Sequence, residues 1–297
     1  MTNFPATLAA FTYRPACLLR VAGPDAAAFL QGQFTNDLSR LEPGAAAYGL
    51  WLDRKGRVIA DSHIIREEQG DGFWVESAAS PSAVVLRRLE DFIVADEVEI
   101  EDATPSWSGV SLVGAGAAAW LAGESRVGLT FAGRRDSGEN WEWIYPDAAS
   151  ATVEAAIAGA RMISPDEATR MRVASGIPSV PADVGPSDLP NEAGLDSVAI
   201  SYSKGCYLGQ EVMARLKSMG RVRRTLVRVD GTGAVPGVPA ALWRGDRREG
   251  ELRSAVADAG GRGYLGLALV SVAAASSDAP LSLSPGGPPS ASIARKS

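Results

Sequence analysis

The sequence predicts an α+β fold in which antiparallel sheets and a few short helices precede a small C-terminal β-barrel. Short strand-like and helix-like segments alternate over residues 1–222, and the 32 glycines and 18 prolines supply the many turns that sheets require. Between residues 231 and 284, short apolar runs separated by Gly/Pro turns indicate the barrel. We expect a body of two α+β lobes over 1–222, the barrel over 223–284 and a flexible tail over 285–297.

The elements of the first lobe follow from local patterns. An apolar run at 16–22 predicts a strand. Pro24 and Asp25 then begin a helix, because proline suits the first helical position and an acid favours the first turn. Apolar residues at helical spacing predict another helix that runs from Ser80 to about Val94. Between the two helices, alternation and turn residues predict an antiparallel meander over 45–53, 57–66 and 73–77.

The second lobe repeats this arrangement over 108–146, with a small-residue helix near 115–122. The run Ser164-Pro165-Asp166-Glu167 is a capping box that begins a helix, and Gly176 ends that helix. Four prolines in 177–190 predict an irregular crossing segment. A helix over about 208–219 and a strand over 221–230 lead into the barrel.

Composition excludes several classes of protein. With 46% hydrophobic and 22% charged residues, the 297-residue chain is globular rather than disordered. A net charge of −6 argues against direct binding to nucleic acid or to an anionic membrane. No segment approaches the roughly 18 apolar residues of a membrane span, and the N-terminus lacks a signal-peptide pattern. We therefore expect a cytoplasmic protein, with a monomer as the default state.

The chain has few candidate metal ligands. It contains two cysteines, Cys17 and Cys206, and one histidine, His63. Counting therefore excludes a resident site with four Cys or His ligands from this chain, and we expect no permanently bound metal. Cys17 lies within an apolar strand and is expected to pack there, and His63 is expected to be structural or exposed.

The segment around Cys206 carries the distinctive chemistry. Cys206 precedes a predicted helix and lies two residues from Lys204, and both features lower the pKa of a thiol. From Lys204 to Arg228 the chain holds seven basic residues and one acid, a net charge of +6. Such a region suggests an anionic ligand or partner. The residues alone leave two alternatives open: a buried cysteine that only packs, and arginines that pair with acids elsewhere.

The run Lys204-Gly205-Cys206-Tyr207-Leu208-Gly209-Gln210-Glu211, followed by Arg215, closely resembles the K-G-C-Y-x-G-Q-E signature of the YgfZ family. Residues 29–37, Phe-Leu-Gln-Gly-Gln-Phe-Thr-Asn-Asp, are similar to a second stretch of that family. The resemblance extends over roughly residues 15–270.

The resemblance implies the fold of the glycine-cleavage T-protein, with antiparallel sheets around a central channel. It also implies binding of tetrahydrofolate, or a one-carbon derivative, and a role in assembling or repairing iron–sulfur clusters of client enzymes, including tRNA-modifying ones. Cys206 would be the reactive thiol, with Lys204 beside it. Aromatic residues would stack on the pterin, and basic residues would meet the anionic tail. The residues predicted to bind folate are Gln31, Gln33, Asp37, Tyr48, Trp51, Tyr207, Gln210, Glu211, Arg215 and Arg223.

Two other functions remain open at this point. One is a folate-dependent aminomethyl- or methyltransferase. The run 56–61 weakens that reading, because it retains at most one acid, Asp61, of the pair that the T-protein has there. The other is a non-enzymatic adaptor for iron–sulfur enzymes, in which the basic region docks the client.

Overall fold

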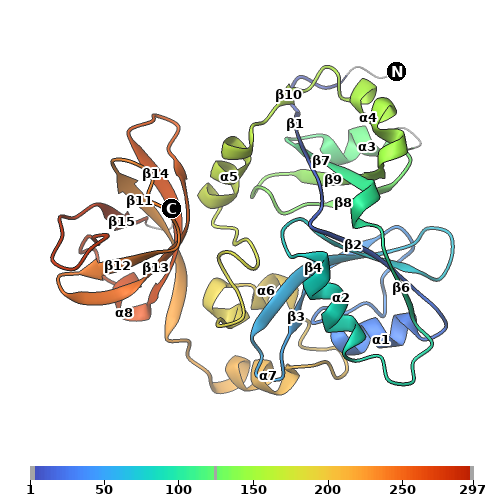
Figure 1. Cartoon of the computed structure of the whole chain (residues 1–297), viewed down its shortest axis with the longest axis horizontal. Coiled ribbons are helices and arrows are strands. Elements are labelled where there is room, and N and C mark those ends of the chain that lie inside the picture. The colour runs from blue at the N-terminus through green and yellow to red at the C-terminus, as the bar shows by residue number, and fades with distance from the viewer. Residues whose placement is uncertain (1–3, 124–125, 295–297) are drawn as a thin grey trace.

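The computed structural model describes residues 4–123 and 126–294 and arranges them around three five-stranded sheets (Figure 1). Among the described residues, every strand pair is antiparallel except the short contact between the first and tenth strands, where Ala9 lies opposite Arg161. The predicted α+β class with antiparallel sheets is therefore confirmed.

The first sheet is the predicted meander joined to two further strands, in the order β3-β4-β5-β2-β6. Its strands are β2 (Cys17–Ala22), β3 (Ala46–Leu52), β4 (Val58–Arg66), β5 (Phe73–Ser77) and β6 (Glu99–Asp102), and its helices are α1 (Ala26–Gln33) and α2 (Ser82–Glu90). One face packs against both helices through fully buried residues such as Leu19, Phe34, Trp51 and Leu89.

The register of this sheet gathers polar side chains on its other face. Tyr48 of β3 lies opposite His63 of β4, and His63 lies opposite Glu76 of β5. Asp61 precedes His63 by two residues and therefore points to the same side of the sheet. The alternation along β4, which buries Val58, Ala60, Ser62 and Ile64 on the core side, leaves this face free to line a site.

The second sheet has the order β10-β1-β7-β9-β8. It comprises β1 (Ala9–Tyr13), β7 (Trp107–Val113), β8 (Leu129–Ala132), β9 (Asn140–Pro146) and β10 (Arg161–Met162), with helices α3 (Ala117–Ala122) and α4 (Ser150–Ala156) and the 3₁₀ turns η1 (Thr104–Ser106) and η2 (Asp147–Ala149). Leu112, Trp120 and Trp143 pack in its core. Ser111 lies opposite Glu142, so this sheet also carries a carboxylate on one face.

Helix α5 (Pro165–Ala174) leads from the second sheet into the predicted crossing segment. The Ser164 hydroxyl accepts the Glu167 N–H, which confirms the predicted cap, and Gly176 follows the helix with φ +67°. The crossing segment, defined here as residues 177–193, ends in η3 (Pro190–Ala193), and α6 (Asp196–Ala199) and α7 (Gln210–Met219) follow. Helix α7 begins two residues later than predicted, because Gly209 caps it in a left-handed conformation with φ +89°.

The third sheet has the order β12-β13-β14-β11-β15 and curls toward a barrel. Its elements are β11 (Arg224–Thr232), β12 (Ala240–Arg244), β13 (Arg247–Ala257), β14 (Gly263–Ser271), α8 (Val272–Ala275) and β15 (Ala291–Ile293). Isolated bridges join Trp243 of β12 to Ser282, and Leu281 to Ala291 of β15. Residues 281–282 thus connect the two edges through isolated bridges, and the predicted barrel is found as a curled half-barrel.

The prediction of a flexible tail over 285–297 is wrong for residues 291–293. These residues form β15 and pair with β11, with Val229 opposite Ile293 and Gly231 opposite Ala291. Main-chain pairing with an existing strand orders this segment despite its Gly/Pro/Ser-rich surroundings. Residues 295–297 of the predicted tail lie outside the described residues.

A buried charge network connects the third sheet to the body. Three acids of the crossing segment are at most 5% exposed: Asp183, Asp188 and Glu192. Three arginines from separate elements bind them. Arg172 of α5 donates to Asp183 at 2.6 Å, and Arg224 of β11 donates to Asp188 at 3.1 Å and to Glu192 at 2.8 Å. Arg253 of β13 donates to both Asp188 oxygens. The network therefore fixes α5, β11 and β13 on one segment.

Candidate functional site

The loop before α7 presents Cys206 at the surface of the molecule. Cys206 is exposed, whereas the side chains on either side of it, Lys204 and Tyr207, are 8% and 6% exposed. Gly209 lies so close to the first sheet that a Cβ there would be 2.9 Å from the Asp53 carbonyl oxygen. The thiol is therefore accessible, and the residues around it are anchored to the core.

Lys204 serves as one of those anchors. Its ammonium donates to the carbonyl oxygens of Gln31, Phe34 and Asn36 at 2.6, 2.7 and 2.9 Å. These oxygens lie in the last turn of α1, at its C-cap and in the turn that follows, where main-chain acceptors lack helical partners. Burial lowers the pKa of Lys204 to about 8, and Asp37 opposes this shift. The prediction that Lys204 assists Cys206 chemically is not supported by this geometry, because all three ammonium protons point at α1.

Cys17 packs in the core as expected. It is fully buried on β2, and burial raises the pKa of its thiol, with a further contribution from Glu76. Among the two cysteines, Cys206 alone is placed for reaction with another molecule.

A central cavity of about 270 Å³ lies where the polar faces of the first two sheets meet. Tyr13 and Glu142 line it from the second sheet, and Arg172 of α5 and residues 177–180 close it from the crossing segment. The first sheet contributes Tyr48, Asp61, Ser62, His63, Glu76 and Ser77. The loop before β9 adds Arg134 and Arg135. Segments more than 100 residues apart in the chain thus form one polar chamber.

Glu142 is the centre of hydrogen bonding on one wall. Its carboxylate accepts from the hydroxyls of Tyr13 and Ser111, both at 2.7 Å, and from Arg135 Nε at 3.2 Å. Burial opposes the charge of Arg135, but Glu142, Tyr13 and Glu76 together hold its pKa above the ordinary value. Arg135 Nη2 is nevertheless buried without a hydrogen-bond partner among the described residues.

His63 and Glu76 form a neutral pair on the opposite wall. His63 Nδ1 lies 3.2 Å from Glu76 Oε2. Burial lowers the pKa of His63 to about 4. Burial, together with Glu142 and Asp61, raises the pKa of Glu76 well above its ordinary value. Both directions favour the uncharged forms, so the contact is a hydrogen bond rather than an ion pair. His63 Nε2 and Glu76 Oε1 are buried without partners among the described residues.

Asp61 and Tyr48 complete the chamber. The Asp61 carboxylate accepts hydroxyl protons from Tyr48 at 3.0 Å, Ser77 at 3.1 Å and Ser80 at 2.7 Å. Burial and Asp61 raise the pKa of Tyr48, so its hydroxyl keeps its proton. The Arg134 guanidinium lies 4.0 Å from the centre of the Tyr48 ring. A second cavity of about 440 Å³ adjoins the chamber and shares Tyr48, His63 and Arg134 with it.

These residues fit a reduced folate. A pterin ring offers N–H donors beside a carbonyl acceptor, and the chamber offers unpartnered atoms of both kinds on Glu76, His63 and Arg135. Its volume of about 270 Å³ suits a bicyclic ring but not a whole folate. The adjoining 440 Å³ cavity, with Arg134 at the junction, provides space for the anionic remainder.

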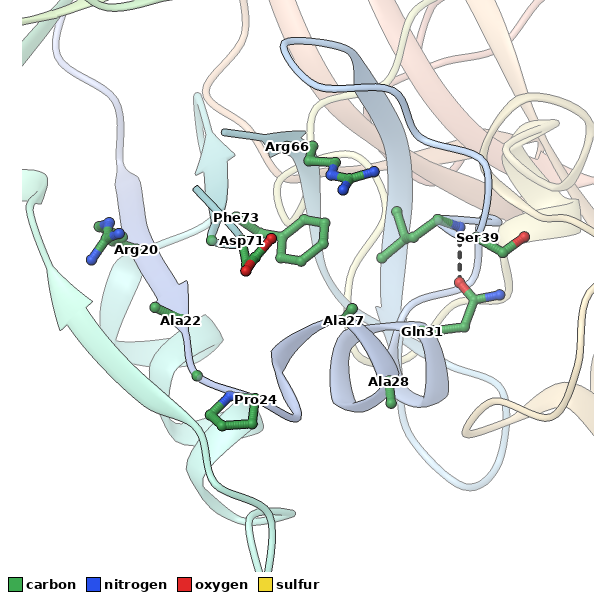
Figure 2. A pocket seen from close by; sticks show the side chains of 13 residues that line it. Arg20, Ala22, Pro24, Ala27, Ala28, Gln31, Ser39, Arg66, Asp71 and Phe73 are labelled. Carbon is green, nitrogen blue, oxygen red and sulfur yellow. Dashed lines mark hydrogen bonds between the residues drawn. The ribbon is translucent and has the colours of Figure 1, made fainter. Parts of the chain in front are cut away.

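The largest of the described cavities, of about 900 Å³, lies elsewhere, between α1, β2 and the turn before β5 (Figure 2). Figure 2 shows Phe73 and Ala27 facing this space, with Gln31 accepting the Leu38 N–H next to Ser39. Its arginines have partners: Arg20 binds Glu67, and Arg66 binds the Leu41 carbonyl oxygen. None of the buried unpartnered atoms among the described residues lines it. Chemistry rather than volume therefore favours the central chamber.

The structure places the predicted folate residues in four environments. Of these residues, Tyr48 lines the chamber. Trp51 and Tyr207 are buried in the core, where no ring face is free for stacking. Glu211, Arg215 and Arg223 are exposed, and Gln210 is partly exposed on the first turn of α7.

The three remaining predicted residues support the structure around α1. Gln31 donates to Asp37 at 2.9 Å and accepts the Leu38 N–H at 2.8 Å, and Gln33 accepts from Arg88 at 2.9 Å. Hydrogen bonds from Ser39 and Gln31 lower the pKa of Asp37 to about 2. These side chains hold the 36–39 turn and α2 in place.

Sequence reasoning missed most of the chamber. His63, expected to be structural or exposed, lines both cavities. Glu142 lies between Trp141 and Trp143 in an apolar strand, and a carboxylate at such a position is rarely buried without a partner. This acid within an apolar strand was the signal in the sequence that pointed to a buried polar site. No comparable signal connects Glu142 to Glu76, because sheet packing rather than sequence brings them together.

Comparison with known proteins agrees with the architecture. Residues 15–129 match the model of the GCVT N-terminal domain. The structure resembles glycine cleavage system aminomethyltransferase T from Bartonella henselae, with a TM-score of 0.79, 19% identity, and coverage of 97% of this chain and 85% of that one. This likeness confirms the predicted T-protein-like fold.

Sequence relatives carry two names. The tRNA-modifying protein YgfZ of Vibrio vulnificus (strain CMCP6) is 30% identical over 240 residues, which cover 79% of this chain and 73% of the relative. The mitochondrial iron-sulfur cluster assembly factor IBA57 of Homo sapiens is 28% identical over 276 residues, which cover 85% and 74%. No helix among the described residues has the length and apolar character needed to cross a membrane.

Proposed function

Because the chain belongs to the YgfZ family, within the proteins that share the T-protein-like fold, we propose that it assists the assembly or repair of iron–sulfur clusters in client enzymes. In this proposal the protein binds tetrahydrofolate, or a one-carbon derivative, in the central chamber. Cys206 supplies the thiol that meets the client or its cluster. The names of the relatives support the iron–sulfur role.

The exposed Cys206 is the observation that carries the proposal. A thiolate is the form that attacks a disulfide or binds iron, and it must be reachable by the other molecule. The loop meets this requirement, because Lys204 and Tyr207 anchor it while the sulfur between them stays exposed. A cysteine that only packed would have been buried, as Cys17 is.

The folate proposal assigns roles to residues of the chamber. Glu76, His63 and Arg135 would bind the polar edge of the pterin through their unpartnered atoms, Glu142 would hold Arg135 in place, and Tyr48 would contact the ring. When bound, a reduced folate carries one-carbon units. The chain's own contribution is to orient that ring in the chamber, with Arg134 placed toward the anionic tail.

One set of variants tests both parts. Cys206→Ser should bind tetrahydrofolate with wild-type affinity in calorimetry but fail to restore tRNA thiolation in a bacterial strain that lacks its own family member. Glu142→Gln should bind tetrahydrofolate about tenfold more weakly, because Arg135 loses the carboxylate that holds it against the chamber, and rescue should fall with binding. Full rescue by Cys206→Ser would refute the role of the thiol.

The same proteins separate the two alternatives. A transferase would convert a one-carbon donor and tetrahydrofolate to product with the purified chain alone. An adaptor would leave client rescue unchanged in Glu142→Gln despite the loss of folate binding. We expect neither result.

A further inference from the structure

The basic region of the sequence divides into two groups in the structure. Lys204 is bound to α1, and Arg224 is bound to Asp188 and Glu192. Arg215, Lys217 and Arg221, by contrast, are exposed and have no carboxylate partner among the described residues. The exposed positive charge of this region therefore lies on α7 and just after it, where Arg223 is also exposed.

A second segment brings more positive charge to the same place. The turn between β3 and β4 carries Arg54, Lys55 and Arg57, all exposed and also without a carboxylate partner among the described residues. This turn packs on α7, since a Cβ at Gly56 would lie 2.8 Å from Met213 Cε and 3.0 Å from Val212 Cβ. Figure 1 shows α7 at the lower edge of the molecule, beside β3 and β4.

The two segments together form what we call the α7 patch. It consists of six exposed cations: Arg54, Lys55, Arg57, Arg215, Lys217 and Arg221. Two acids accompany them. Glu211 lies in the first turn of α7, and Asp53 accepts the N–H groups of Lys55 and Arg57 within the turn. The patch is thus strongly positive on a chain whose net charge is −6.

Cys206 lies beside this patch. It precedes Gly209 by three residues, so its Cα lies within about 11 Å of the Gly209 Cα. Gly209 itself contacts the Asp53 carbonyl oxygen at the start of the basic turn. A molecule seated on the α7 patch is therefore brought next to the exposed sulfur.

We propose that the α7 patch docks an acidic surface of a client protein and so delivers that client to Cys206. This inference rests on the proposed function for the nature of the client, but the patch itself is defined by the structure. Positive potential over a compact area steers an acidic partner and sets its orientation.

The surface chemistry favours a protein over RNA. Proteins that bind single-stranded RNA stack its bases on exposed aromatic rings. In the described structure Trp51 and Tyr207 are buried, and Lys217 lies 4.0 Å from the centre of the Tyr202 ring, so none of these three rings presents a free face. A long polyanion would also extend beyond the patch onto an otherwise acidic molecule.

The test compares two double variants of the full chain. Arg57→Glu/Arg215→Glu reverses two charges of the patch. Arg247→Glu/Arg262→Glu makes the same change at two exposed arginines, one at the start of β13 and one in the turn before β14, and serves as the control. The experiment uses cells that lack their own family member. A photoreactive amino acid at position 55 cross-links the chain to the proteins it contacts, and tRNA thiolation measures function.

We expect the patch variant to form about tenfold fewer cross-links to iron–sulfur proteins, or fewer still, and to lose most of the rescue. The control should keep both. Cross-links should map to acidic segments of those proteins and should weaken as salt rises in extracts. Equal rescue and equal cross-linking by the two variants would overturn the proposal. Cross-links that are removed by ribonuclease would overturn it in favour of RNA.

Two controls distinguish a failure of the docking proposal from a failure of the proposed function. Tetrahydrofolate binding should be unchanged in both double variants, because neither pair lines the central chamber. Rescue by Cys206→Ser would refute the role of the thiol, while the cross-linking comparison at position 55 would still decide whether the patch docks a protein.

Discussion

Two sets of basic residues in this molecule have the same charge and opposite surroundings. Arg172, Arg224 and Arg253 bind the buried acids of the crossing segment and join three elements. The six cations of the α7 patch face solvent and have no carboxylate partner among the described residues. Arg223 and Arg224 are adjacent in the chain, yet the first is exposed and the second is in the network. Whether a basic residue stabilises the fold or stays available to a partner thus depends on which acidic residues the fold places next to it.

The largest effect should come from breaking the charge network. Burial favours the neutral form of Asp188, but hydrogen bonds from Arg253 and Gly185 and the charge of Arg224 hold its pKa below the ordinary value. Asp188→Ala should lower the free energy of unfolding by about 3–5 kcal/mol, because it leaves Arg253 without its buried partner. Urea unfolding measures this, with the exposed Asp246→Asn as the control. A loss under 1 kcal/mol would show that the network is dispensable.

The His63–Glu76 pair of the central chamber offers an intermediate case, in which both groups are buried and their pKa shifts favour the uncharged forms. The pKa of His63 is about 4 in the folded chain and about 6.5 when unfolded, so the unfolded state binds more protons between these values. Stability should therefore fall as pH drops from 6.5 to 4. Over this window, the free energy of unfolding of the wild type should fall by about 3 kcal/mol relative to that of His63→Gln. Since His63 is the only histidine, a constant difference would contradict the pKa.

The smallest effects on stability are expected for substitutions of two lysines, Lys204 and Lys217, which lie thirteen residues apart. Lys204→Met leaves three carbonyl oxygens at the end of α1 without their charged donor, which should cost about 1.5–3 kcal/mol. Lys217→Met removes an exposed cation and should change stability by less than about 0.5 kcal/mol. Thermal unfolding of the two variants gives the comparison. Equal losses would mean that the ammonium of Lys204 does not support the helix.

Local patterns in the sequence were enough for much of the fold. The strand at 73–77, the cap at Ser164 and the meander before α2 depend on neighbouring residues, and the structure has them as predicted. The family signature likewise identified Cys206, and the structure leaves that sulfur exposed. These features are decided within short stretches of chain, where spacing and turn chemistry act.

The partners of individual side chains depended on tertiary structure. Lys204 binds carbonyl oxygens about 170 residues away, and Arg224 binds acids more than 30 residues away. The chamber joins Glu76 and Glu142 from different sheets. No local pattern specifies such pairs. The basic region is continuous in the sequence, but in the structure its residues belong to the Lys204 anchor, the buried charge network and the exposed α7 patch.

The three-residue strand β15 has a practical consequence. It covers one side of β11, which would otherwise offer unpaired N–H and C=O groups along Val229–Gly231. An open strand edge of this kind is a template for pairing with another chain, and so a route to aggregation. A purification tag or fluorescent fusion at the C-terminal end should therefore be separated from Ile293 by a flexible spacer, so that the strand can still close the sheet.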